Sequence, residues 1–547
     1  MRRHLLPASG FALLCAHAAA APALDVDRLS FRASGPSPFV ADCNGVPQTG
    51  TLYPNAEVEP FVAANPRNPL NLVNTWQQDR WSDGGSQGLA TAYSFDGGLH
   101  WRRGFPPFTR CAGGNATNGG DYERGSDPWV SFSPNGTVHA LVLVINNAPS
   151  PGAPSSAMLA TRSTDGGRTW SRIATLVADT AERFNDKNTI TADPTDSRYV
   201  YAVWDRLDFV SPDSAGPTLL ARSTNNGRSW EPARIIYDPG VNGQTIGNRI
   251  EVLPDGTLVN VFTDIDYVAG TLTLRAIRST DKGATWSAPI KVADELPLGT
   301  VDPETGTPIR DAAILPQFAV SRAGKISVVW QDARFSGFQR DGIAYAESTD
   351  GGLTWSEPVQ INRDPLVQAF IPTIHVRRDG GIGVSYYDLR SNTADPATLP
   401  TDLWLTRSRD GLTWHESRVT QTFDVAGAPF AGGLFLGDYQ GLTSIGPIFI
   451  PFFAKTTGDP ANANDVYSHV ALDSILSGAA SGSASIDRQV AQDEAALPAL
   501  ALQGTGRALG AVPTAARAAS LQAADRTMRA RVPDWDARRA LRSAPPR

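Results

Sequence analysis

Acidic and basic side chains recur as pairs at the ends of apolar segments in this sequence. Arginine binds anions and sugar hydroxyls through several directed hydrogen bonds, and carboxylates can transfer protons. Such pairs could line a polar binding pocket, or each could neutralise itself as an ion pair on its own loop. Taken as a set they favour a binding site. The pairs are Asp79-Arg80, Asp205-Arg206, Asp332-Ala-Arg334 and Asp388-Leu-Arg390.

Other polar groups stand just before apolar segments, where the first strand of a repeated β-unit would begin. If these starts share one face of a repeated β-structure with the ends of the second strands, their charges converge around one axis. This adds Arg249 and Asp438 to the candidate substrate-binding residues Arg80, Arg206, Arg334, Arg390, Asp332 and Asp388. The groups are Arg124-Gly-Ser-Asp127, Asp186-Lys187, Asn248-Arg249 and Gly437-Asp438-Tyr439.

An eight-residue motif with the consensus Ser-Thr-Asp-Gly-Gly-x-Thr-Trp recurs six times and must position these groups. Its Asp can accept backbone N–H groups inside a turn, its Gly tolerates a positive φ, and its Trp offers a large apolar face. Such a motif closes a β-hairpin, so we expect its aspartates to be scaffold. The copies span 94–101, 163–170, 223–230, 279–286, 348–355 and 408–414, the last being one residue short.

Each motif follows a longer apolar hairpin, such as 127–144 or 316–330, so one unit holds four antiparallel strands. Radial repetition of such units describes an all-β fold, the β-propeller. A seventh unit lacks the motif and has three strands within 439–472, for which residues 28–34 are the candidate fourth strand. We therefore expect seven blades, with six as the alternative.

These residues resemble the sialidase (neuraminidase) superfamily, in which the repeated motif is called the Asp box, over about residues 58–473. Sialidases run an apolar strand into Asp-x-Arg or a close variant, then a short loop that carries the acid/base Asp. The segment 71–98 follows that order, so the resemblance implies Asp83 as the acid/base, with Asp79 as the fallback. Tyr439-Gln-Gly-Leu442 looks like the motif of the nucleophilic tyrosine. A neutral phenol approaches a carboxylate-bearing sugar without charge repulsion.

The sequence departs from the family pattern at two places. Glu59-Pro60-Phe61 stands where sialidases have Arg-Ile-Pro, whose Arg binds the substrate carboxylate. The strand that should begin with the Tyr-activating Glu begins Gly247-Asn248-Arg249, and Glu251 aligns poorly with that Glu. The first hypothesis is therefore an exported glycoside hydrolase of the exo-α-sialidase type for terminal acidic sugars. The second is a non-catalytic propeller that binds glycans or proteins.

The two ends of the chain differ from the middle. A basic start, an apolar stretch and Ala-x-Ala options up to Ala23 describe a signal peptide over 1–23, which predicts a secreted or periplasmic protein. Residues 24–57 form an N-terminal segment with the candidate closing strand. Residues 474–547, rich in Ala and Arg, predict a flexible tail that is helical around 514–532. Outside the signal peptide, Cys43 and Cys111 are predicted to form a disulfide, with two separate buried thiols as the alternative.

Composition excludes several classes of partner. The net charge is −7 and no basic run occurs, which argues against nucleic acid. No segment after the signal peptide reaches the ~20 apolar residues of a membrane span. The histidines show no paired spacing and no calcium-loop pattern appears, so we predict no metal and no cofactor. We expect a monomer that binds glycans.

Overall fold

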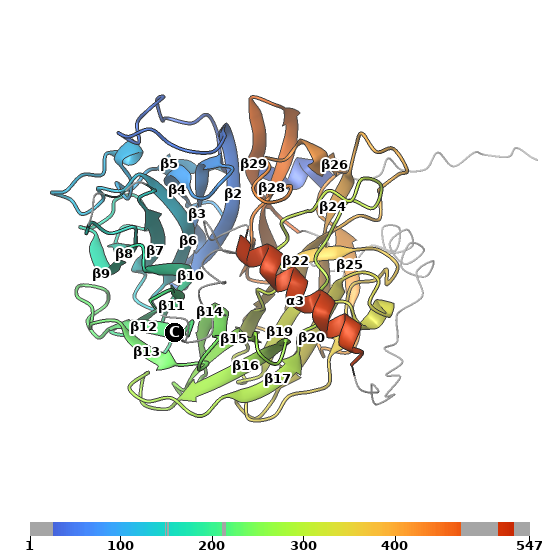
Figure 1. Cartoon of the computed structure of the whole chain (residues 1–547). Helices are drawn as coiled ribbons and strands as arrows, with labels where there is room; N and C mark the ends of the chain where they lie inside the picture. Colours follow the sequence, from blue (N-terminus) through green and yellow to red (C-terminus); the bar gives the residue numbers. More distant parts are fainter. Residues whose placement is uncertain (1–25, 148, 150–151, 211–214, 472–511, 530–547) are drawn as a thin grey trace, which may run out of the picture.

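A computed structural model describes residues 26–147, 149, 152–210, 215–471 and 512–529 of the 547-residue chain. The predicted signal peptide lies outside these residues. Four-stranded antiparallel sheets are arranged radially, as Figure 1 shows, and the fold is all-β as predicted. None of the described helices is long and apolar enough to cross a membrane. The choice between seven and six blades, and the closure of the ring, stay predictions.

The first three groups of strands follow the chain in order and turn sharply at each hairpin. Within each group, neighbouring strands pair antiparallel. The strands are β2 (Leu52–Asn65), β3 (Asn68–Trp81), β4 (Ser86–Ser94) and β5 (Arg102–Gly104); β6 (Arg124–Phe132), β7 (Val138–Ile145), β8 (Ser156–Ser163) and β9 (Ala174–Asp179); and β10 (Arg183–Ala192), β11 (Val200–Asp208), β12 (Thr218–Ser223) and β13 (Arg234–Tyr237).

The next three groups repeat this order. The strands are β14 (Gly243–Val252), β15 (Leu258–Asp266), β16 (Thr271–Ser279) and β17 (Ile290–Asp294); β18 (Gln317–Val320), β19 (Ile326–Asp332), β20 (Gly342–Ser348) and β21 (Val359–Gln360); and β22 (Ala369–Val376), β23 (Ile382–Asp388), β24 (Pro400–Ser408) and β25 (His415–Arg418), with β26 (Phe423–Asp424) paired to β24. Short 3₁₀ helices are η1 (Val26–Leu29), η2 (Arg110–Ala112), η3 (Arg334–Ser336) and η4 (Val425–Gly427).

The last group of strands includes one strand from the N-terminal segment. It contains β27 (Gly441–Ile445), β28 (Ile448–Asp459) and β29 (Asn462–His469). The strand β1 (Ser30–Arg32), inside the predicted closing segment, pairs antiparallel with β29. β29 also meets β2 at the pair Ala56 and Asn464. The first and last groups are therefore neighbours in space.

Each of the six repeated motifs closes the hairpin between the third and fourth strands of its sheet. In the second copy, Asp165 Oδ1 accepts the Thr169 N–H at 2.9 Å, and Ser163 Oγ accepts the Gly167 N–H at 2.9 Å. Gly167 has φ +93°, and an added Cβ would lie 2.7 Å from Val73 of the preceding sheet. The motif thus fixes a turn and lets one sheet approach the next.

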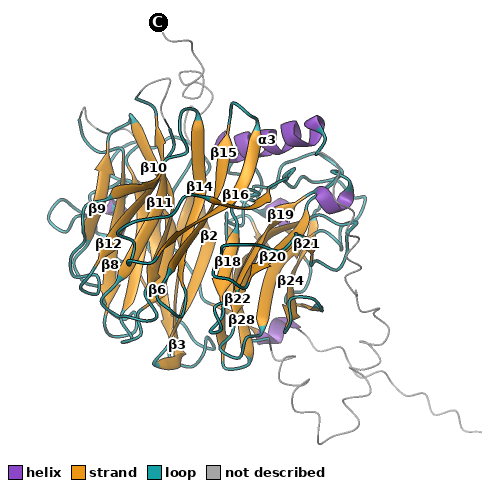
Figure 2. Ribbon diagram, turned by 90° about the horizontal axis from the view of Figure 1, so that it is seen from below, coloured by secondary structure: helices purple, strands orange, loops and turns teal. Residues whose placement is uncertain are grey.

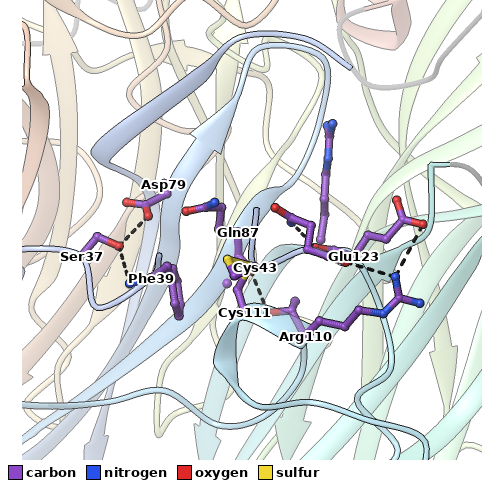
Figure 3. Close-up of a disulfide and its surroundings, with 12 residues drawn as sticks. Ser37, Phe39, Cys43, Asp79, Gln87, Arg110, Cys111 and Glu123 are labelled. Carbon is purple, nitrogen blue, oxygen red and sulfur yellow. Dashed lines mark hydrogen bonds and ion pairs between the residues drawn. A yellow bond between two sulfur atoms is a disulfide. The ribbon is translucent and has the colours of Figure 1, made fainter. Parts of the chain in front are cut away.

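Cys43 and Cys111 form a disulfide, which confirms the predicted pairing, with their Cα atoms 4.7 Å apart. Figure 3 shows it between the N-terminal segment and the loop after β5. Beside it, Asn44 Nδ2 donates to the Glu123 carbonyl at 2.6 Å. The disulfide therefore fastens the N-terminal segment to the first sheets.

The predicted tail is described only over 512–529, where Thr514–Arg529 forms the helix α3. α3 lies across one face of the molecule and contacts β16 (Figures 1 and 2). Ala524 and Met528 are fully buried in the hydrophobic core. The helix lies within the stretch predicted to be helical, 514–532, and the flexible tail over 474–547 stays a prediction. Composition alone missed the small residues, at positions 516, 520, 523, 524 and 527, that let one face of the helix approach the sheets closely.

Candidate active site

Five inner strands carry the same β-bulge. In each, two residues of the inner strand oppose one residue of the second strand, so the strand bends and one side chain is redirected. The first bulge residue has a positive φ in every case. These residues are Glu59 (φ 55°), Asp127 (φ 49°), Lys187 (φ 45°), Gly247 (φ 72°) and Ile371 (φ 51°).

The charged bulge residues of three sheets meet at one point. Lys187 Nζ lies 3.4 Å from Glu59 Oε1 and 3.0 Å from Asp127 Oδ1. The same ammonium lies 2.9 Å from Asp438 Oδ2, just before β27. One lysine therefore joins inner segments of four sheets, and this convergence places the group near the centre of the molecule.

Two arginines complete this group. Arg310 binds both carboxylate oxygens of Asp438, at 3.0 Å from Nε and 2.6 Å from Nη2. Arg80 donates to Gln77 Oε1 at 2.8 Å, and the Gln77 amide donates to Glu59. We call Glu59, Gln77, Arg80, Asp127, Lys187, Arg310, Asp438 and Tyr439 the central cluster.

Burial dominates the electrostatics of the central cluster. No member is more than 7% exposed. Three carboxylates face three cations, so the named charges balance. Burial raises the pKa of the Glu59 carboxyl above its ordinary value, against the attraction of Lys187. Burial likewise lowers the pKa of Arg80 to about 10. Proton uptake by Glu59 would leave the cluster with a positive charge.

Tyr439 lies against the cluster with its ring in an aromatic pocket. Its ring centroid is 5.1 Å from that of Trp129 and 6.4 Å from that of Phe61. The phenol donates to the Pro128 carbonyl at 3.1 Å. Burial raises the pKa of Tyr439 well above its ordinary value, and the charges of Glu59 and other carboxylates add to this. The phenol is therefore protonated in this arrangement.

Asp83 and Asp79 lie outside the central cluster. Asp83 pairs with Arg124 at 2.7 Å and accepts a hydrogen bond from the Thr49 hydroxyl at 2.6 Å. Asp79, with φ 64°, accepts the Ser37 hydroxyl and the Asn55 N–H, and Figure 3 shows the Ser37 contact. Burial raises the pKa of Asp79. Asp83 keeps about a third of its side chain exposed, at 35%.

Two of the predicted Asp-x-Arg pairs are local ion pairs. Arg334 binds both oxygens of Asp332, at 2.8 and 2.7 Å. Arg390 donates to Asp388 at 2.6 Å and lies 3.6 Å above the Trp404 ring. Each aspartate also accepts an indole N–H, from Trp330 or from Trp404. These contacts match the alternative in which the pairs neutralise themselves.

The remaining predicted arginines also have partners of their own. Arg206 pairs with Asp179 at 2.9 Å. Arg249 pairs with Glu251 at 2.7 Å and lies 5.6 Å from the Trp129 ring centroid, which puts it beside the wall of the Tyr439 pocket. The structure thus brings Arg80, Asp438 and Tyr439 together, and leaves Arg206, Arg334 and Arg390 with local partners.

Sequence reasoning missed Arg310 and Gln77 as members of the site. Arg310 lies in the irregular segment between β17 and β18, where no periodicity marks it. One signal was available for the bulges, because proline inside a strand marks an edge or a bulge. Glu59-Pro60, Asp127-Pro128 and Ile371-Pro372 all carry it. Among the described residues, no group of three or more His, Cys, Asp or Glu side chains is arranged to hold a metal ion.

Comparison with known proteins gives one curated relative of this chain. A sialidase of Micromonospora viridifaciens is 27% identical over 300 residues, which are 50% of this chain. The resemblance to the sialidase superfamily is thereby confirmed. The aligned part spans 42% of that sialidase, less than half of its length. No protein-family model matches the chain.

Comparison with solved structures finds sialidases and an arabinanase among the matches. The Hadza microbial sialidase Hz136 has a TM-score of 0.43 and 17% identity, covering 73% of this chain and 76% of its own. The Trypanosoma rangeli sialidase in complex with sialic acid has a TM-score of 0.38 and 14% identity, covering 64% and 55%. An α-L-arabinanase of Penicillium chrysogenum has a TM-score of 0.38 and 16% identity, covering 63% and 92%.

Proposed function

We propose that the protein is an exported glycoside hydrolase of the exo-α-sialidase type, which releases a terminal acidic sugar at the central cluster. The observation that carries this proposal is the position of Tyr439 beside Lys187, whose ammonium lies 5.8 Å from the ring centroid and binds three carboxylates. A phenol among carboxylates and cations has the groups that a tyrosine nucleophile needs. The disulfide supports export to an oxidising compartment.

The charge balance of the cluster supports an acidic sugar. A carboxylate-bearing substrate would bring a negative charge into a neutral group. Glu59, whose pKa burial raises, could take up a proton and leave Lys187 with one negative partner fewer. The substrate carboxylate would then replace that partner. Glu59 stands in the segment where sialidases carry Arg-Ile-Pro, so this exchange would substitute for the absent arginine.

The reaction would follow the two-step route of retaining glycosidases. The Tyr439 oxygen attacks the anomeric carbon while its proton passes to a carboxylate of the cluster, and the glycosidic C–O bond breaks. Asp83 is the proposed acid for the leaving oxygen, with Asp79 as the fallback. Asp83 would first have to exchange its contact with Arg124 for one with the substrate. Water then releases the sugar from Tyr439.

The second candidate function is non-catalytic glycan binding. It is favoured by the separation of the two proposed catalytic groups, because Asp83 is held by Arg124 while Tyr439 donates to a backbone carbonyl. In this case the site at the central cluster would retain glycans without cleaving them.

Purified protein should be assayed on fluorogenic sialosides, uronides and arabinofuranosides. We expect cleavage of a substrate that carries a carboxylate. Asp83→Ala should then lower turnover by ~10²–10⁴-fold, the usual contribution of a general acid, and Tyr439→Phe at least as much. The matched control is Tyr387→Phe, because Tyr387 is also a buried phenol that donates to a backbone carbonyl, at 2.7 Å. Full activity in both catalytic variants would contradict these roles, and glycan retention without cleavage would favour the second function.

A further inference from the structure

A cavity of about 720 Å³ lies beside the loop that connects β17 to β18. This volume is typical of sites for small organic molecules. Most of its wall is aliphatic, and Leu366 on this wall is 74% exposed. The wall includes Leu298, Val301, Pro308, Leu366, Val367 and Leu389.

Two cationic side chains line the cavity. Arg340 and Arg526 both line it, and no Asp or Glu does so among the residues that the structure describes. Arg340 donates to the Leu366 carbonyl and Arg526 to the Leu298 carbonyl. Neither guanidinium forms an ion pair with a carboxylate in the part of the chain that the structure describes. In a protein of net charge −7, two such arginines on one apolar cavity point to an anionic ligand.

Side-chain hydrogen bonds to the backbone hold the wall of the cavity in place. The Gln368 side chain binds Val301 twice, accepting its N–H at 3.1 Å and donating to its carbonyl at 2.9 Å. The Asp341 carboxylate accepts the N–H groups of Leu298 and Gly299, each at 2.8 Å. Both contacts fix the loop in place, so the cavity does not depend on a single flexible side chain.

We propose that this cavity binds a small organic anion with an apolar body. Its carboxylate or sulfonate group would accept hydrogen bonds from Arg340 and Arg526, and its apolar body would cover Leu366 and Val301. Because Arg526 belongs to α3 and Arg340 to the segment between β19 and β20, the bound anion would bridge this helix to that segment. This site is separate from the central cluster and does not depend on the proposed glycosidase activity.

Titration calorimetry with 2-naphthoate and its neutral isostere 2-naphthamide tests the charge requirement. Hydrogen bonds to a charged group are stronger than those to a neutral one, so we expect 2-naphthoate to bind at least ~10-fold more tightly than the amide. Arg340→Gln and Arg526→Gln should each weaken naphthoate binding at least ~10-fold. Arg322→Gln, an exposed arginine in the turn between β18 and β19, is the matched control and should leave it unchanged.

Limited proteolysis of the protein and of the Arg340→Gln variant gives a second, independent test. Naphthoate should slow proteolytic cleavage within α3 in the full chain, because it bridges α3 to the segment between β19 and β20. Arg340→Gln should abolish this protection without altering the helix itself. Equal binding of naphthoate and naphthamide, unchanged affinity in both arginine variants, or no binding of naphthoate at all would each overturn the proposal.

Discussion

The hairpin motifs and the inner-strand bulges are two backbone devices that this molecule repeats, and they differ in what repeats with them. In the hairpins the side chains recur with the backbone, since Asp165, Asp281 and Asp350 each accept N–H groups of their own turn. In the bulges the backbone recurs, but the redirected residue is Glu, Asp, Lys, Gly or Ile. Because the side chain differs from one bulge to the next, no particular side chain is needed to form the bulge.

This difference separates scaffold from site. A non-glycine residue in the left-handed region costs about 1–3 kcal/mol, so Glu59, Asp127 and Lys187 occupy strained positions that glycine would fill more easily. Gly247 fills one of the five. The three charged residues are thus retained at an energetic cost, and their contact with one another gives the reason.

The largest expected effect comes from removing the cation that joins the bulges. Lys187→Ala would leave the carboxylates of Glu59 and Asp127 buried without this partner, and breaking such a group typically costs about 3–5 kcal/mol. Denaturant unfolding should measure this loss. The control is Lys291→Ala, because its pair with Asp294 is largely exposed and contributes about 0–1 kcal/mol. Similar losses in both variants would show that the buried contacts of Lys187 stabilise the fold no more than an exposed ion pair does.

A buried carboxyl group outside both devices and an aspartate of a hairpin motif should respond to pH with opposite signs. Burial raises the pKa of Glu295, which follows β17, to about 8, so the native state favours its protonated form. That contribution is present below the ordinary value and is lost as pH rises through about 8. Hydrogen bonds from Thr354 lower the pKa of Asp350 to about 2, so its contribution is lost as pH falls below about 4.

Unfolding midpoints measured from pH 3 to pH 9 would test these signs. Glu295→Gln keeps a neutral acceptor for the Thr263 hydroxyl and should flatten the decline of stability toward alkaline pH by roughly a few kcal/mol. Asp350→Asn should flatten only the acidic limb. A variant that alters the wrong limb would contradict the assignment.

The smallest expected effect is the loss of one hairpin motif. Asp350→Ala removes the acceptor of the Leu353 and Thr354 N–H groups, at a cost of about 1–2 kcal/mol, and should leave any catalytic activity unchanged. Asp350→Asn should cost less, since Asn225 fills this place in the third copy and still accepts the Ser229 N–H at 2.9 Å. Loss of activity at constant stability in Asp350→Ala would mean that the hairpins do more than build the scaffold.

The sequence predicts the fold well because the hairpin chemistry is local. Each motif carries its own acceptor, glycine and tryptophan within eight residues, so the turn can be recognised without knowing its neighbours. The disulfide was likewise predictable, since only two cysteines remain outside the predicted signal peptide. The packed helix was not, because Ala524 and Met528 find their partners only in the folded sheets.

The candidate site was only partly predictable for the same reason. Asp438 and Tyr439 stand in one recognisable segment, whereas Lys187 and Arg310 meet Asp438 from 251 and 128 positions away. The Asp-x-Arg pairs were conspicuous in the sequence, but Arg334 and Arg390 bind the aspartates two residues before them. Short-range pairing is easy to see in a sequence and is satisfied locally, while the long-range contacts depend on the arrangement of the sheets.

The pairing of β1 with β29 has a consequence for the order of events during synthesis. Ser30 Oγ and His469 Nδ1, 3.0 Å apart in the finished molecule, are separated by 439 positions in the chain. β1 is therefore made long before β29 and lacks this partner until the sheets between them have emerged, and closing so long a loop is slow. Until then the partner edge of the last sheet does not exist, and an exposed strand invites association with other chains. Emergence of β29, rather than collapse of any earlier sheet, is the step that ends this exposure.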